Sequence, residues 1–121
     1  GLSTVIAQLY ADTDGSVRGI TIGPRLEAAL MQLFVPGSRG EDSGIPLGPD
    51  QLSNLLRQLT ELAERGRVEG RGRLLITPPG LRIGVRRLVE PILPDLPVVS
   101  LGELPPTIPV EGTAQWELAR A

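Results

Sequence analysis

The side chains of this chain that could do chemistry are arginines and carboxylates, because three other reactive types are missing. Its 121 residues include no histidine, no cysteine and no lysine, so all twelve cationic side chains are arginines. Imidazole and thiolate supply most zinc sites and most nucleophile–base pairs, while lysine supplies Schiff bases and the P-loop cation. An enzyme built from this segment alone would have to work with carboxylates, hydroxyls and guanidinium groups.

The arginines are unevenly distributed along a chain whose formal net charge is -2. Seven of them fall between Arg65 and Arg87, where the only acidic residue is Glu69. One interpretation of this basic zone is a free-standing α/β module that binds an anionic ligand or nucleic acid. Nucleic acid fits less well, because the chain has few aromatic side chains for base stacking and is acidic overall.

Arg82, Arg86 and Arg87 project from a predicted helix on the side opposite its apolar stripe. They could form an ordinary solvated face, in which Glu90 makes one weak intrahelical pair with Arg86. They could instead dock an acidic partner, because the arginine fork grips carboxylates through two parallel hydrogen bonds. We take these three residues as the partner-binding hypothesis.

Several other patterns resemble functional motifs but do not satisfy their requirements. The glycine-rich run over residues 66–72 leaves a helix and enters a strand without a lysine, whereas a P-loop has the opposite order. The turn over residues 12–15 lacks the glycine and closing glutamate of a calcium loop. The acid pairs Glu61 with Glu64 and Glu41 with Asp42 fall on a solvated helix face and in a loop. We expect no metal site, no cofactor site and no catalytic acid–base couple.

Three helices are predicted from apolar residues at helical spacing. The first predicted helix, over residues 1–12, begins without a capping residue and is interpreted as the end of a linking helix. Gly23-Pro24 opens a second helix that runs to about Phe34, and a flexible loop is predicted over residues 35–48. The clearest helix begins at Pro49, with Gly66 as its predicted C-cap.

A fourth helix and several strands complete the predicted fold. Strands are expected over residues 17–22, 74–76 and 97–100, and a helix over 79–90 joins the last two in a right-handed crossover unit. Residues 108–118 alternate apolar and polar side chains, which indicates a half-buried strand, and Pro109 and Gly112 indicate a bend or an edge position. Trp116 is interpreted as core or edge cover, with an anchor at a subunit or partner interface as the alternative. Residues 13–121 therefore form one α/β domain, a small mixed sheet packed against amphipathic helices.

The segment over residues 88–104 has a distinctive sequence. The run Leu88-Val89-Glu90-Pro91-Ile92-Leu93-Pro94-Asp95-Leu96-Pro97-Val98-Val99-Ser100, followed by Glu103-Leu104, resembles the C-terminal part of the large export-gate protein of type III secretion systems. The resemblance extends to the segments over residues 2–10, 17–26 and 74–78, in the order of that family. Leu101 departs from it, because many relatives have an aromatic residue there.

The resemblance implies a function in recognition. It implies the C-terminal subdomain of an inner-membrane protein whose N-terminal membrane region is missing here, with this segment on the cytoplasmic side. Such parts assemble into a nine-membered ring that docks chaperone–substrate complexes, a gatekeeper and the stalk of the export ATPase, and they catalyse no reaction. The chain lacks the valine-rich ending of flagellar members, which favours an injectisome, and we expect the isolated fragment to be monomeric.

Overall fold

The computed structural model describes residues 15–35 and 47–118. The predicted linking helix over residues 1–12 and most of the predicted loop over 35–48 lie outside the described residues. The predicted strands and the other predicted helices lie inside them.

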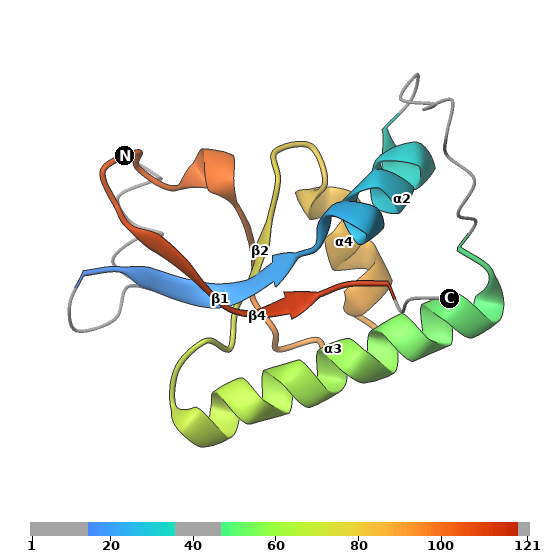
Figure 1. The fold of residues 1–121 in the computed structure, drawn as a ribbon, viewed down its shortest axis with the longest axis horizontal. Coiled ribbons are helices and arrows are strands. Elements are labelled where there is room, and N and C mark those ends of the chain that lie inside the picture. The colour runs from blue at the N-terminus through green and yellow to red at the C-terminus, as the bar shows by residue number, and fades with distance from the viewer. Residues whose placement is uncertain (1–14, 36–46, 119–121) are drawn as a thin grey trace.

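The fold is built on a four-stranded sheet (Figure 1). Its strands are β1 (Val17–Ile22), β2 (Leu75–Thr77), β3 (Val98–Ser100) and β4 (Val110–Trp116), arranged in the order β3-β2-β1-β4. All three pairings, β1 with β2, β1 with β4 and β2 with β3, are parallel. The α/β class and the β2–helix–β3 crossover unit are confirmed, but within the described residues the sheet is parallel and not mixed.

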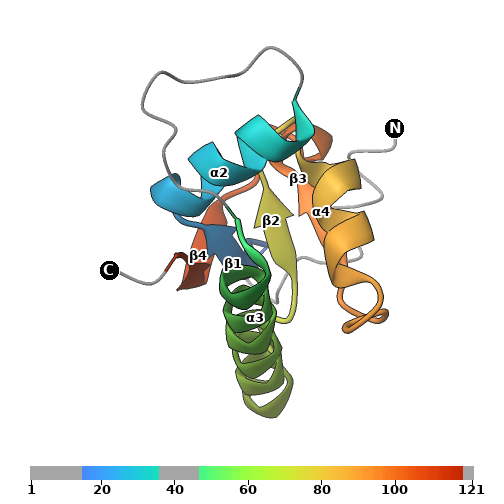
Figure 2. The same cartoon turned by 90° about the vertical axis from the view of Figure 1, so that its right-hand side faces the viewer.

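Helices α2 (Pro24–Phe34), α3 (Pro49–Glu69) and α4 (Arg82–Val89) connect or flank the strands. Prolines occupy the first turns of α2 and α3, where the missing N–H costs nothing because it would have no intrahelical partner. Figure 2 shows the strands side by side, with α4 beside β3 and α3 near β1 and β4. Helix α4 begins three residues later than predicted, because residues 79–81 form a turn first.

The two faces of the sheet carry separate apolar clusters. The smaller cluster contains Val17, Leu74, Ile76, Val99 and Leu104, and Ile108 and Val110 pack against it. The segment from β3 to β4 thus supplies apolar cover to the face of the sheet away from α2, α3 and α4. The larger cluster, which joins all three helices to the sheet, includes Ile20, Ile22, Leu26, Leu30, Leu55, Leu59, Leu75, Leu81, Val85, Val89, Val98 and Trp116.

Strand position explains the two kinds of strand sequence. All residues of β2 and β3 are buried, as the continuous apolar runs of parallel strands covered on both faces require. Among the described strands β4 pairs with β1 alone, and it is largely exposed, which confirms the edge position that was one of the two predicted alternatives. Gly19 pairs with Gly112 and Ile20 pairs with Ala114, so β4 has one extra residue between these two pairs. The predicted bend is therefore a local irregularity of one residue.

The end of α3 differs from the prediction. The helix continues past Gly66 to Glu69, and Gly70 is the C-cap, with φ 75° in the left-handed region. Gly66 is required for a different reason, because a Cβ there would lie 2.9 Å from the backbone nitrogen of Arg73. Its missing side chain lets the chain that leaves α3 fold back against the helix. Both glycines come shortly before a strand. Only the close approach of Gly66 to the backbone near Arg73 distinguishes its role from that of Gly70.

We expect Gly66→Ala to destabilise the fold by about 1–3 kcal/mol, because the added methyl group meets backbone that no side-chain rotation can move. In an open helix position the same replacement would stabilise by about 1 kcal/mol, so the sign of the change separates the two roles. Urea denaturation of the variant measures it. The exposed α3 residue Ser53→Ala is the control, and stabilisation by Gly66→Ala would show that the helix does not pack in this way.

Candidate docking surface

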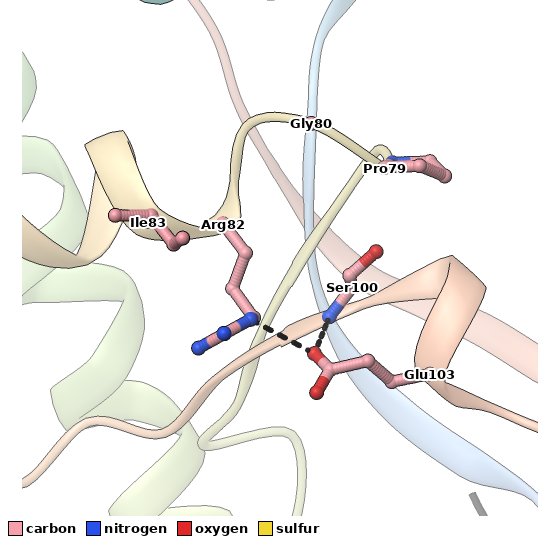
Figure 3. Close-up of a pocket in the computed structure, with 6 residues that line it drawn as sticks. All are labelled: Pro79, Gly80, Arg82, Ile83, Ser100 and Glu103. Carbon is pink, nitrogen blue, oxygen red and sulfur yellow. Dashed lines mark hydrogen bonds and ion pairs between the residues drawn. The ribbon is translucent and has the colours of Figure 1, made fainter.

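The predicted partner-binding arginines lie on α4, at the free edge of the sheet where β3 pairs only with β2. The turn before α4 leaves the carboxyl end of β2, and the 3-10 helix η1 (Leu101–Glu103) leaves the carboxyl end of β3. Figure 3 shows that residues from these two segments face one another across a shallow pocket. We name the candidate docking surface as Pro79–Arg87 together with Ser100–Glu103.

Arg82 makes an ion pair with this second segment. Its Nε lies 3.2 Å from Oε1 of Glu103, and the same oxygen accepts a hydrogen bond of 2.9 Å from the backbone N–H of Ser100. The Ser100 hydroxyl accepts from the backbone N–H of Gly102, which completes the cap of η1. The Arg82 side chain is 42% exposed, so it lies at the surface while it joins α4 to η1.

Arg86 has a structural role. Its Nη1 donates to the carbonyl oxygen of Leu96 at 2.9 Å, and its Nη2 donates to that of Pro94 at 3.3 Å. Its Nε lies 3.6 Å from Oε2 of Glu90, which is the predicted intrahelical pair. The fork of one guanidinium therefore holds the proline-rich turn that enters β3 against α4.

A second arginine holds the same turn from another element. The Nη1 of Arg73, which precedes β2, donates to the carbonyl oxygen of Asp95 at 3.0 Å. The three prolines of this turn have no backbone N–H, so the turn has fewer donors than carbonyl groups. The arginine side chains supply donors in their place, which gives a physical reason for arginines before β2 and in α4.

Arg87 differs from its two neighbours. Its side chain is exposed, and it makes no ion pair or hydrogen bond with any residue the structure describes. The three predicted residues thus lie on one short helix but do not form a uniform basic face: Arg86 and Arg82 are half-buried and bonded within the fold, and Arg87 alone is unpaired.

Part of the wider basic zone from Arg65 to Arg87 is likewise bonded within the fold. Arg67 pairs with Glu64 on α3, and this hydrogen bond lowers the pKa of Glu64 and raises the pKa of Arg67. Both groups are fully exposed, so water screens the pair. With Arg73, Arg82 and Arg86, four of the seven arginines have partners within the fold. A hydrogen bond to a carbonyl group leaves the charge of the guanidinium in place, so only the pairs with Glu64, Glu90 and Glu103 offset part of the positive charge of the zone.

An anion site at a helix N-terminus is present, but the chain fills it itself. The backbone N–H groups of Arg25 and Leu26, in the first turn of α2, donate to the carboxylate of Glu117 at 3.0 and 2.7 Å. A Cβ at Gly23 would lie 2.2 Å from Glu117 Oε2, so only glycine admits the carboxylate so closely. Sequence reasoning missed this contact, although a glycine before a helix without an N-cap side chain is a signal for it.

Trp116 lies beside this contact and is fully buried, which confirms the predicted core position. Its indole Nε1–H donates to the carbonyl oxygen of Leu55 in α3 at 2.7 Å. The backbone N–H of Glu117 donates to Oε1 of Gln58 at 3.0 Å. The end of β4 is thus bonded to α2 through Glu117 and to α3 through Trp116 and the backbone.

Other predicted features have ordinary structural roles. Glu61 and Glu64 lie exposed on α3, as predicted, while Glu41 and Asp42 lie outside the described residues. Within residues 15–35 and 47–118 no group of three acidic side chains is arranged to hold a metal ion. Nor is any helix of this described part long and apolar enough to cross a bilayer.

Comparison with known proteins identifies the chain's relatives. The model of the FHIPEP family matches residues 1–109. The chain belongs to this family. The flagellar biosynthesis protein FlhA of Caulobacter vibrioides is 29% identical over 93 residues, and that of Bacillus subtilis is 27% identical over 110 residues. These matches cover 77% and 91% of the chain but only 13% and 16% of the two relatives, so it spans a small part of their length.

Solved structures share the fold. A nonameric EPEC SctV-C has a TM-score of 0.71 at 21% identity, covering 94% of this chain and 33% of that one. A chain in the solved complex of Chlamydia pneumoniae CdsV and CdsO has a TM-score of 0.72 at 21% identity, with the same two coverages. The family match and the flagellar relatives confirm the predicted resemblance to the type III export-gate protein, and the solved structures confirm the fold of its C-terminal part.

The Glu117 contact predicts a stability effect. Glu117→Gln should destabilise the fold by about 2 kcal/mol, because two charge-assisted hydrogen bonds at the N-terminus of α2 are weakened. Chemical denaturation at neutral pH measures this. Glu90→Gln, which removes an equal charge from an exposed pair, should change stability by less than about 0.5 kcal/mol. Equal effects of the two variants would contradict the assigned role.

The division among the α4 arginines predicts a second difference. Arg86→Gln should cost about 1–3 kcal/mol, because it removes the donors of two carbonyl groups in the turn before β3. Arg87→Gln, one residue away with the same charge change, should stay within about 0.5 kcal/mol. Thermal unfolding of both variants compares them, and a larger loss for Arg87→Gln would reverse the assignment.

Proposed function

We propose that this chain is the non-catalytic cytoplasmic C-terminal subdomain of a bacterial inner-membrane export gate, and that its docking surface binds other proteins of the secretion system. In this proposal it contributes to a nonameric ring beneath the export channel. Chaperone–substrate complexes, the gatekeeper and the export ATPase stalk are the expected partners. The subdomain recognises these proteins and transforms none of them.

The match of the FHIPEP family to residues 1–109 is the observation on which the proposal rests. The nonameric state of SctV-C supports the expectation of a ring. The solved complex of CdsV with CdsO supports the expectation that a gate of this fold binds a protein partner. These proteins have low identity to the chain, so both inferences are made by analogy of fold.

The chemistry of the described residues supports a binding role over catalysis. The acidic side chains that approach other groups closely do so to complete the fold: Glu117 caps α2, Glu103 caps η1, and Glu64 pairs with an arginine. Glu103 is the one acid among the residues that line the pocket of Figure 3, whereas an acid–base couple in a hydrolase places two carboxylates across a cleft. On the docking surface, Ile83 and Leu101 are 58% and 47% exposed, and apolar side chains of this kind are suited to protein contacts.

Charge reversal in the full-length gate protein tests the proposal. The double variant Arg82→Glu and Arg87→Glu leaves Arg86 in place, because reversal of Arg86 would release the turn before β3. We expect its affinity for at least one of the chaperone–substrate complex, gatekeeper and stalk protein to fall about tenfold or more, since each lost charged contact is worth about 1.5 kcal/mol or more. Calorimetric titration with purified proteins measures this.

The matched control reverses two exposed arginines of α3, Arg57→Glu and Arg65→Glu, with the same change in net charge. We expect this control to retain binding of the three partners. Unchanged affinity of the α4 variant for all of them would refute the docking surface. Equal losses in both variants would mean that overall charge, and not this surface, governs binding.

A further inference from the structure

Arg82 stands between two hollows in the surface. One, of about 270 Å³, is lined by Pro79, Gly80, Arg82, Ile83, Ser100 and Glu103. The other, of about 330 Å³, is lined by Arg82, Arg86 and the chain from Pro94 to Val98. Because Arg82 lines both, its guanidinium group is accessible from either side. The two hollows adjoin at Arg82, and we refer to them together as the groove.

The ion pair of Arg82 leaves part of its guanidinium unused. Only its Nε is paired, with Glu103 Oε1, and its two terminal nitrogens have no partner among the described residues. Figure 3 shows these nitrogens pointing away from Glu103. Glu103 Oε1 is itself held by the Ser100 N–H, so the carboxylate fixes the position of the arginine from one side. The open side presents donors in the geometry that a second carboxylate accepts.

The surroundings of Arg82 differ between its two sides. Towards the first hollow the groove has apolar walls, Pro79 and Ile83, and the 47% exposed Leu101 follows the lining residue Ser100. Towards the second hollow, the two terminal nitrogens of Arg86 donate hydrogen bonds to the carbonyl groups of Leu96 and Pro94. Arg82 is thus the arginine of the groove whose two terminal nitrogens both lack a partner among the described residues, and apolar surface lies next to it.

We propose that Arg82 anchors a carboxylate side chain of an extended acidic segment in a partner protein, and that an adjacent apolar side chain of that segment enters the hollow beside Ile83. This deepens the docking function proposed above and rests on it. It assigns recognition to Arg82 and leaves Arg87 a minor electrostatic contribution. The bound segment carries Asp or Glu next to a branched aliphatic or aromatic residue.

The charges beside the groove favour a singly charged group. Glu103 lines the first hollow and Asp95 lines the second. A doubly charged phosphate at Arg82 would meet repulsion from both carboxylates, whereas a carboxylate carries half that charge. The fork geometry also matches a planar carboxylate directly.

A phage-displayed library of random dodecapeptides, selected on the 121-residue chain, tests this inference. We expect the enriched sequences to share an acidic residue beside an apolar one. Synthetic peptides of this consensus should bind Arg82→Gln about tenfold more weakly than the parent chain, and Arg87→Gln within about twofold. Ile83→Ser keeps the charge and should also weaken binding severalfold.

Arg82→Lys provides a second measurement if Arg82→Gln does not fold, because it keeps the charge and removes the fork. We expect it to lose severalfold affinity for the consensus peptides. The inference is overturned if no sequence is enriched, if the consensus lacks an acid, or if peptides bind Arg82→Gln and Arg82→Lys as well as the parent. Export partners that bind the full-length gate independently of Arg82 would leave the docking function standing and reject only the groove.

Discussion

The fold depends on contacts that join the end of β4 to α2 and α3. Glu117 places a carboxylate on the backbone N–H groups at the start of α2, and Trp116 donates from the buried core to α3. A strand that pairs with only one neighbour gains little from its ladder alone. These contacts to two helices fix β4 in parallel beside β1 and bring residues more than fifty positions apart into one core.

The position of β4 determines where the docking surface can lie. With β4 on one edge of the sheet, β3 forms the other, and α4 lies against it. The turn that enters β3 is rich in prolines and so is short of backbone donors. Arg73 and Arg86 supply those donors, which leaves Arg82 and Arg87 as the arginines of α4 that can contact another protein. Structural demand and recognition are thus divided among residues of one type.

Much of the fold could be predicted from sequence, because the patterns involved are local. Helical spacing located α2 and α3, and the alternating tail located an edge strand with Trp116 in the core. The end of α3 was misplaced, because Gly66 and Gly70 carry the same sequence signal and only packing against the chain near Arg73 distinguishes them. The parallel direction of β4 depends on a connection with no periodicity, so no local pattern indicates it.

The candidate site was predicted only in part. Sequence placed Arg82, Arg86 and Arg87 on one helix, but their different roles depend on partners far along the chain, such as Glu103 and the carbonyl of Leu96. The contact of Glu117 with α2 spans more than ninety positions and was missed for the same reason. The family resemblance was recognised from the particular sequence of residues 88–104. The spacing of apolar residues in this segment would by itself indicate only a helix, a turn and a strand.

Hydrogen–deuterium exchange on the full-length gate protein, with and without its purified export partners, tests most directly whether this subdomain recognises proteins through the surface around α4. The account predicts that a bound partner slows exchange in residues 79–90 and 100–103, while the buried strand β2 exchanges slowly in both states. Slowed exchange only along β4 or the exposed side of α3, with the α4 region unchanged, would contradict it.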